Sequence, residues 1–216
     1  EIMPSLVGSE MCIETDVSAS GNCAVGGIAG RNNGNLILTN DNSSVSRSVS
    51  GTNASGVGGI AGINEAGGTL TVTGTSNEID AVGSGVSVIG LERVGGIVGV
   101  NRGTIGHTGA SMPENYLASK AKLVRASRGY AGGIVGETHG DITCAVNRSV
   151  SVTADEGYAG GITAFNNKGQ AIRNCKNFGT VSSSKGYASG IAAHNAGTIT
   201  DLLLYTSDAA DDLIGV

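Results

Sequence analysis

The stretch Val94-Gly95-Gly96-Ile97-Val98-Gly99 decides the fold, because five further copies of it occur along the chain. The six blocks align without gaps, and isoleucine occupies the fourth position of every one. They cover Val25–Gly30, Val57–Gly62, Val94–Gly99, Ala131–Gly136, Ala159–Ala164 and Ala188–Ala193. Successive isoleucines are 32, 37, 37, 28 and 29 residues apart. Repeats of about 20–50 residues are typical of solenoids, propellers and other arrays.

Each block is followed by a turn and then by a second short apolar segment. Two positions after the block comes Asn or Thr, and a glycine follows within three residues, as in Asn101 and Gly103. Asn and Gly tolerate left-handed backbone conformations, so this pattern predicts a turn. An apolar residue such as Ile105 comes next, and alternating residues such as Val150-Ser151-Val152 precede the later blocks. We therefore expect three short strands per repeat.

Three strands punctuated by turns favour an all-β fold, a right-handed parallel β-helix (β-solenoid) of about six coils. Equivalent residues of successive coils then stack on one another. The stacked isoleucines should face the core: Ile28, Ile60, Ile97, Ile134, Ile162 and Ile191. The turn asparagines should form an amide ladder at a corner: Asn32, Asn64, Asn101, Asn166 and Asn195. The paired glycines allow a tight bend or a close approach of neighbouring walls.

Two other repeat architectures fit the sequence less well. A β-propeller needs four antiparallel strands per blade and usually about 40–45 residues, more than the shorter repeats provide. Helical repeats need Ala/Leu/Glu/Lys-rich stretches with a period of 3.6 residues, which this chain lacks.

Composition limits the function classes. The chain of 216 residues has no Trp, 5 Tyr and 2 Phe, so the usual aromatic core of an enzyme of this length is missing. No run approaches the roughly 18 apolar residues of a membrane span. The cysteines have no CxxC spacing, which leaves a zinc ribbon unsupported. We expect buried thiols, with a Cys12–Cys23 disulfide as the alternative; the four cysteines are Cys12, Cys23, Cys144 and Cys175.

The C-terminal segment differs from the rest of the chain. Leu203–Asp212 interrupts the Gly/Asn/Thr-rich composition and resembles the translation of a transposase-type sequencing adaptor. We therefore interpret residues 1–24 as part of a preceding coil, 25–201 as the solenoid and 202–216 as non-native sequence. Without the three aspartates of that last segment the net charge is −2 instead of −5. A nearly neutral solenoid gives no case for nucleic-acid binding.

The repeats resemble the GLUG motif, a short glycine-rich repeat of bacterial surface and secreted proteins. Residues 95–105 and 161–181 carry the resemblance, which covers roughly residues 25–201. It implies an extracellular or cell-surface location in bacteria. Such repeats occur in adhesin-like proteins and in the non-catalytic part of immunoglobulin-A-specific metallopeptidases.

The sequence offers no catalytic, metal or cofactor site. His107, His139 and His194 do not form an HExxH motif. Asp155 and Glu156 are adjacent, and neighbouring strand residues point to opposite faces, which argues against a catalytic pair. Calcium-binding β-rolls repeat Gly-Gly-x-Gly-x-Asp, and these blocks have no Asp at that position.

One column of tyrosines is a candidate binding surface. Tyr130, Tyr158 and Tyr187 occupy the same repeat position, each between a glycine and an alanine. If they point outward they form an aromatic strip that can bind sugar rings or a protein; if they point inward they fill the core. The insert Ser111–Ser119 should lengthen one coil and protrude as a loop, which is either an ordinary insertion or part of a binding face.

Two functions from different classes remain. The first is a non-catalytic stalk or ligand-display scaffold whose partners are a host or cell-surface glycan or protein and the rest of the parent chain. The second is the substrate-binding part of a β-helix carbohydrate-active enzyme, with a spacer of a secreted metallopeptidase as a further alternative. An enzyme should concentrate acidic and basic residues along one face of successive coils, whereas here the charges are sparse and scattered.

Overall fold

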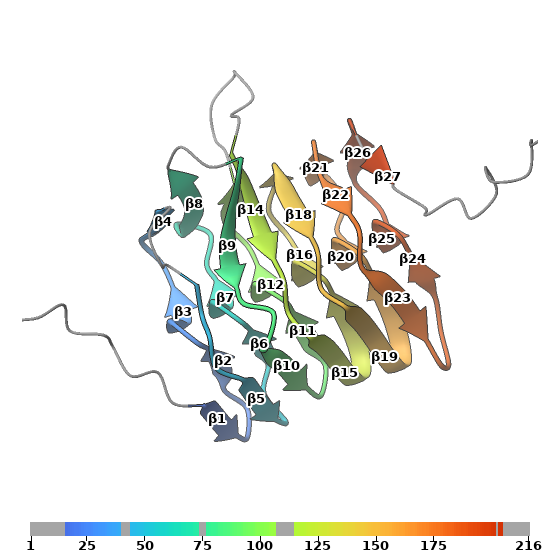
Figure 1. The fold of residues 1–216 in the computed structure, drawn as a ribbon. Helices are drawn as coiled ribbons and strands as arrows, with labels where there is room; N and C mark the ends of the chain where they lie inside the picture. The colour runs from blue at the N-terminus through green and yellow to red at the C-terminus, as the bar shows by residue number, and fades with distance from the viewer. Residues whose placement is uncertain (1–15, 40–43, 74–76, 107–114, 202, 205–216) are drawn as a thin grey trace, which may run out of the picture.

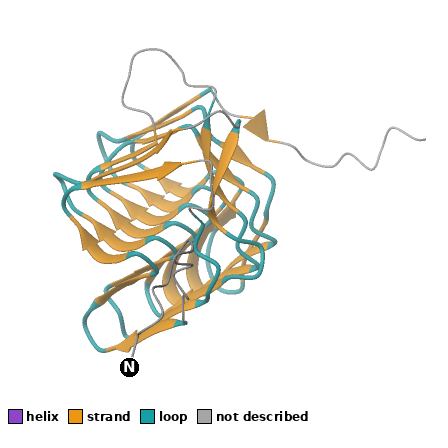
Figure 2. Ribbon diagram, turned by 60° about the vertical axis from the view of Figure 1, so that its left-hand side comes forward, coloured by secondary structure: helices purple, strands orange, loops and turns teal. Residues whose placement is uncertain are grey.

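The computed structural model describes residues 16–39, 44–73, 77–106, 115–201 and 203–204 of the 216-residue chain. In these residues every regular element is a β-strand, and all strand pairs are parallel. None of them forms a helix that could cross a membrane. Strands of successive coils lie side by side in tilted layers (Figures 1 and 2). The parallel β-solenoid is therefore confirmed.

The described strands form four sheets along the solenoid. Sheet A contains β1 (Val17–Ser20), β5 (Val49–Thr52), β10 (Ser87–Gly90), β2 (Ala24–Gly26), β6 (Gly56–Gly58), β11 (Arg93–Gly95), β15 (Leu123–Gly132), β19 (Ser151–Gly160), β23 (Thr180–Ser183) and β24 (Ala188–Ser189). Sheet B contains β3 (Ala29–Asn32), β7 (Ala61–Asn64), β12 (Val98–Asn101), β16 (Val135–Thr138), β20 (Thr163–Asn166) and β25 (Ala192–Asn195).

Sheet C contains β4 (Asn35–Thr39), β8 (Thr69–Thr73), β13 (Thr104–Gly106), β17 (Ile142–Thr143), β21 (Ala171–Arg173) and β26 (Thr198–Thr200). Sheet D contains β9 (Glu78–Val82), β14 (Tyr116–Ser119), β18 (Ala145–Asn147), β22 (Lys176–Asn177) and β27 (Leu203–Leu204). Sheets B and C each have six strands, one for each of the six coils.

The coil is divided into more strands than the three expected per repeat. The coil that starts at β6 contains five strands, β6 to β10, because sheet A takes two strands from it and sheet D adds one. In the next two coils the two sheet A strands fuse into the ten-residue strands β15 and β19. The fused strands pass through Gly129 and Gly157 at φ 88° and 120°, a left-handed conformation that glycine adopts without strain.

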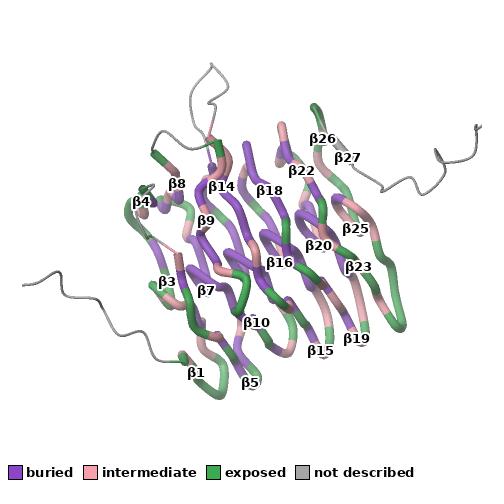
Figure 3. The backbone as a smooth tube through the Cα atoms, in the orientation of Figure 1, coloured by how far each residue is buried: buried purple, intermediate pink, exposed green. Residues whose placement is uncertain are grey.

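The isoleucine column forms the centre of the core. Five of the six repeat isoleucines, from Ile60 to Ile191, are buried, with exposed fractions of 0 to 5%. Ile28 differs, because its side chain is 49% exposed in the first coil. Figure 3 shows the same trend along the described residues, with buried segments in the central coils and more exposed ones in the first and last described coils. Ile28 directly precedes β3, the end strand of sheet B within the described residues, so no described strand covers it on the side away from β7.

The asparagine column forms the amide ladder in two separate runs. The Nδ2 of Asn32 donates to Asn64 Oδ1 at 2.8 Å, and Asn64 donates likewise to Asn101 at 2.8 Å. Asn166 donates to Asn195 at 2.7 Å. Between the two runs stands Thr138, whose hydroxyl accepts from Asn101 Nδ2 at 3.1 Å. A buried threonine thus interrupts the ladder in the fourth coil.

A second, shorter ladder lies at the end of sheet D and was not predicted. Asn147 Nδ2 donates to Asn177 Oδ1 at 2.8 Å, and one coil earlier the hydroxyls of Ser119 and Ser149 lie 3.1 Å apart. Each asparagine also accepts from the backbone N–H two residues later, at 3.0 Å from Ser149 and 3.1 Å from Gly179. The signal in the sequence is an Asn followed two residues later by Ser or Gly, repeated after 30 residues.

The paired glycines pack where a side chain would not fit. A Cβ on Gly133 would overlap the carbonyl oxygen of Gly161 in the next coil, and the same relation holds between Gly96 and Gly133. The expected close approach of neighbouring walls is therefore confirmed at these positions.

Two segments differ from their expected roles. Of the predicted protruding loop Ser111–Ser119, residues 111–114 lie outside the described part, while Tyr116–Ser119 is the sheet D strand β14 with Leu117 fully buried. Leu203–Leu204, in the segment interpreted as non-native, pairs with β22 as the last strand of the same sheet. Leu117 shows that sheet D extends the core into a region that the repeat alignment assigned to a loop.

The cysteines pack in the solenoid wall. Cys144 and Cys175 are buried, Cys23 is half-buried, and no disulfide joins these three. Cys12, the expected alternative partner of Cys23, lies outside the described residues. Burial raises the pKa of the Cys175 thiol to about 12, so this thiol stays protonated at neutral pH and is unreactive.

Candidate binding groove

The three tyrosines of the repeat form one column on sheet A. Tyr130 and Tyr158 are register partners in β15 and β19, and their ring centroids are 5.7 Å apart. Tyr187 extends the column with a centroid 5.3 Å from that of Tyr158. Tyr130 and Tyr158 are half-buried, and Tyr187 is 65% exposed. The next residue of each long strand, Ala131 or Ala159, is buried in the core, so the tyrosines belong to the opposite, outer face.

A second column on sheet B faces the tyrosines. Glu137, Phe165 and His194 are register partners in β16, β20 and β25. The ring of Phe165 lies 5.3 Å from that of Tyr130 and 4.3 Å from that of His194. His194 also stacks on Tyr158 at 6.3 Å. Strands of sheets A and B, together with Tyr187 directly before β24, therefore contribute the five rings of the aromatic cluster: Tyr130, Tyr158, Tyr187, Phe165 and His194.

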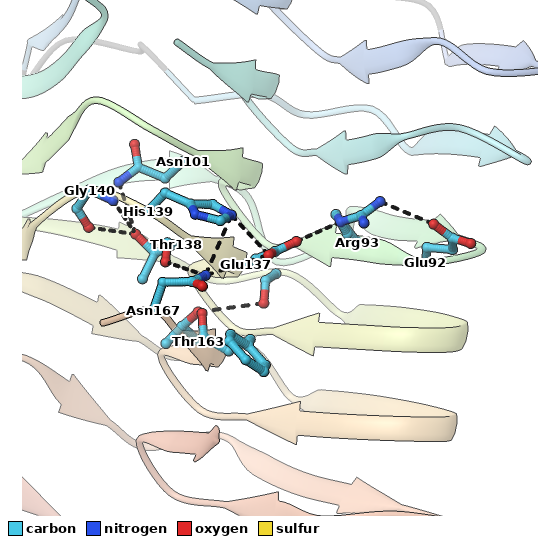
Figure 4. A network of polar contacts seen from close by, with 11 residues as sticks. Glu92, Arg93, Asn101, Glu137, Thr138, His139, Gly140, Thr163 and Asn167 are labelled. Atoms are coloured by element: carbon cyan, nitrogen blue, oxygen red, sulfur yellow. Dashed lines mark hydrogen bonds and ion pairs between the residues drawn. The ribbon is translucent and has the colours of Figure 1, made fainter. Parts of the chain in front are cut away.

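We call the outer corner between sheets A and B, where the tyrosine column meets the column of Glu137, Phe165 and His194, the groove. A polar network continues it toward the third coil (Figure 4). Arg93, the register partner of Tyr130 in β11, donates from Nε to Glu137 Oε2 at 2.6 Å and forms an ion pair with Glu92 at 3.0 Å. His139 Nε2 lies 2.9 Å from Glu137 Oε1. Asn167 Nδ2 donates to the carbonyl oxygen of the turn residue Thr138 at 3.0 Å. The Arg93–Glu137 pair thus joins sheets A and B at the edge of the aromatic cluster.

Two pKa shifts fix the charge state of this region. Burial raises the pKa of Glu137, but the hydrogen bond and charge of Arg93, together with His139, lower it by more. The pKa of Glu137 is therefore below its usual value. Burial, and then the negative charge of Glu137, raises the pKa of Tyr130. At neutral pH Glu137 is therefore an anion, and the Tyr130 hydroxyl keeps its proton and can donate.

A pocket of about 350 Å³ adjoins Tyr130. It lies where the bend at Glu92 in the third coil meets the left-handed Gly129 in the fourth, and Arg93 and Arg128 complete its lining. A volume near 300 Å³ is at the small end of ligand pockets in proteins, so the pocket can hold one small chemical group or a single sugar.

The remaining candidate residues lie apart from the groove or outside the described part. Asp155 pairs with Arg125, with Oδ2 2.6 Å from the guanidinium, whereas Glu156 pairs with Lys185 at 2.7 Å, so the two neighbouring carboxylates have separate partners. His107 is outside the described residues. The part of the chain that the structure describes contains no group of three His, Cys, Asp or Glu placed to hold a metal ion.

The sheet B half of the groove was not predicted from the sequence. Each of its residues follows a sheet A residue of the groove by seven positions: Glu137 after Tyr130, Phe165 after Tyr158 and His194 after Tyr187. This constant offset is the signal that could have identified the second column, since stacked coils keep such offsets in register.

Comparison of the chain with protein-family models, with curated proteins and with solved structures finds no match.

Proposed function

We propose that this chain is a non-catalytic β-solenoid segment of a large extracellular bacterial protein, an adhesin-like scaffold whose groove binds a glycan. The observation that carries the proposal is the aromatic cluster, in which rings from two sheets lie 4.3 to 6.5 Å apart along one outer face. The exposed parts of these stacked rings provide apolar surface for sugar rings, and polar neighbours such as Asn167 and Arg93 can bond to sugar hydroxyls.

The solenoid supports this proposal by holding the rings in place. Tyr130 and Tyr158 belong to strands that pair over nine registered positions, from Leu123 with Ser151 to Gly132 with Gly160. A surface held in this way loses little conformational freedom when a ligand binds, which favours affinity.

The arrangement of carboxylates supports a binding role over hydrolysis. Glycoside hydrolysis needs two carboxyl groups that converge on one bond. In the groove Glu137 is held by Arg93 and His139, and Glu92 is held by the same arginine. Both carboxylates are thus committed to cationic or imidazole partners in the described structure.

The location rests on the resemblance of the repeats to the GLUG motif of bacterial surface and secreted proteins. A long solenoid is an effective spacer because each coil contacts only its neighbours, so length can be added without changing the binding coils. The rest of the parent chain then continues the stack or anchors it.

The test is glycan binding by the full 216-residue chain on a glycan array, followed by titration calorimetry of the best ligand. We expect Tyr158→Ala to weaken binding roughly tenfold or more, because the central ring is lost. Phe178→Ala is the matched control, since Phe178 is an exposed ring stacked under Arg148 outside the groove. Circular dichroism checks that both variants remain folded. Cleavage of any bound polysaccharide, or equal effects of the two variants, would overturn the proposal.

A further inference from the structure

The pocket beside Tyr130 is lined mainly by hydrogen-bond donors. Arg93 and Arg128 contribute guanidinium groups, and Tyr130 contributes a hydroxyl whose proton is retained. The single carboxylate in the lining, Glu92, is bound to Arg93 at 3.0 Å. A pocket that presents donors and has its carboxylate neutralised suits an anionic acceptor.

Arg128 is the lining residue best placed to bind such an acceptor. Its side chain is exposed, and within the described ranges no ion pair is recorded for it. Its register neighbour Glu156 bonds to Lys185 at 2.7 Å, and the charge of Arg128 helps to lower the pKa of Glu156 without an ion pair between the two in the described structure. Arg93, in contrast, already serves both Glu92 and Glu137. Arg128 therefore retains a guanidinium edge for a ligand.

We infer that the groove binds an acidic glycan, with the sugar ring on Tyr130 and Tyr158 and its carboxylate on Arg128 in the adjoining pocket. This inference rests on the proposed function and specifies its ligand as a polymer of uronic acid type. An arginine binds a carboxylate through two parallel N–H···O bonds, which also fixes the orientation of the sugar relative to the rings.

The experiment compares trigalacturonic acid with its methyl ester, which keeps the sugar rings and removes the charges. We expect the acid to bind the wild-type chain at least about tenfold more tightly in titration calorimetry, as befits a charge-assisted pair. Arg128→Gln should abolish this preference, and 0.5 M salt should reduce it by screening. The control Arg125→Gln should retain the preference, because Arg125 binds Asp155 and does not line the pocket.

The possible results separate this inference from the proposed function. If the acid and the ester bind equally, or if Arg128→Gln keeps the preference, the acidic-glycan inference is refuted while glycan binding stands. Tighter binding of a sulfated galactose oligomer than of trigalacturonic acid would refute the carboxylate assignment. Failure of every glycan to bind would refute both proposals together.

Discussion

The substitution Thr138→Asn should stabilise the solenoid by repairing its interrupted amide ladder. The Thr138 hydroxyl has one hydrogen, which it donates to the carbonyl oxygen of Gly140, and it accepts from Asn101 Nδ2 and Gly140 N–H. Nothing remains for Asn166 in the next coil, and Asn166 Oδ1 is buried without a hydrogen-bond partner in the described structure. An asparagine at position 138 would have the missing donor.

The size of the effect follows from the intact part of the ladder. At Asn64, as at Asn166, the first glycine of the turn comes three residues later instead of two. The Oδ1 of Asn64 accepts from Asn32 of the preceding coil at 2.8 Å. The Oδ1 of Asn166 has no such donor in the described structure. A buried unpaired acceptor costs about 1–3 kcal/mol. An asparagine at position 138 can also keep the bond to the carbonyl oxygen of Gly140, because Asn101 Nδ2 donates in the same way to Gly103, two residues later. We therefore expect Thr138→Asn to recover roughly 1–2 kcal/mol of this cost.

Urea unfolding followed by circular dichroism measures the change. Thr138→Ser is the matched control, since its hydroxyl can replace that of threonine but supplies no second donor. Because repeat proteins can unfold in steps, hydrogen–deuterium exchange of the backbone amides around Asn166 provides a local measure of stability. An unfolding free energy for Thr138→Asn equal to or below that of the wild-type chain would refute the reasoning.

Three further changes test other parts of the structure. Gly133→Ala should cost about 1–3 kcal/mol or more in urea unfolding, because its Cβ overlaps the next coil, whereas Gly85→Ala, with no described atom within 4 Å, should be nearly neutral. Iodoacetamide at pH 8 should label Cys23 in the native chain but Cys175 only after unfolding, as peptide mass mapping will show, since burial raises the Cys175 pKa to about 12. Glu137→Gln should lower the melting temperature at pH 7, and the difference should shrink below pH 4.5. The folded-state pKa of Glu137 is depressed, so its stabilisation is lost as the pH falls through that value, and a constant difference would contradict the assignment.

The core of the fold was predictable because the same physical requirement recurs in every coil. An isoleucine must fill the interior and a turn asparagine must bond to its neighbours, so residues such as Ile97 and Asn101 recur at fixed offsets. Sheet D was not predictable in this way. Its strands have two to five residues, too short for alternation to show, and a segment such as Lys176–Asn177 is polar.

The groove was only half predictable for a different reason. The tyrosine column follows from spacing along one strand, as in Tyr130 and Tyr158. The contact of these rings with Phe165 depends on how sheets A and B meet, which no periodicity encodes. The meeting is close because a Cβ on Gly136 would approach the backbone nitrogen of Val94 to 2.7 Å. A glycine at that corner therefore brings the outer faces of the two sheets together.

The position of the groove along the solenoid follows from the same corner. In the second coil the groove positions are Gly56 and Ile63. A Cβ on Gly56 would overlap the carbonyl oxygen of Gly62 and approach Val100 at 3.3 Å, so backbone and aliphatic groups close the corner there. From the third coil onward the outer positions change to Arg93 and then to tyrosines, whereas the inner isoleucine stays the same. Core and ladder residues repeat because stacking requires it. Stacking does not require the outer residues of the groove to repeat. Their differences between coils therefore indicate where a ligand can be recognised.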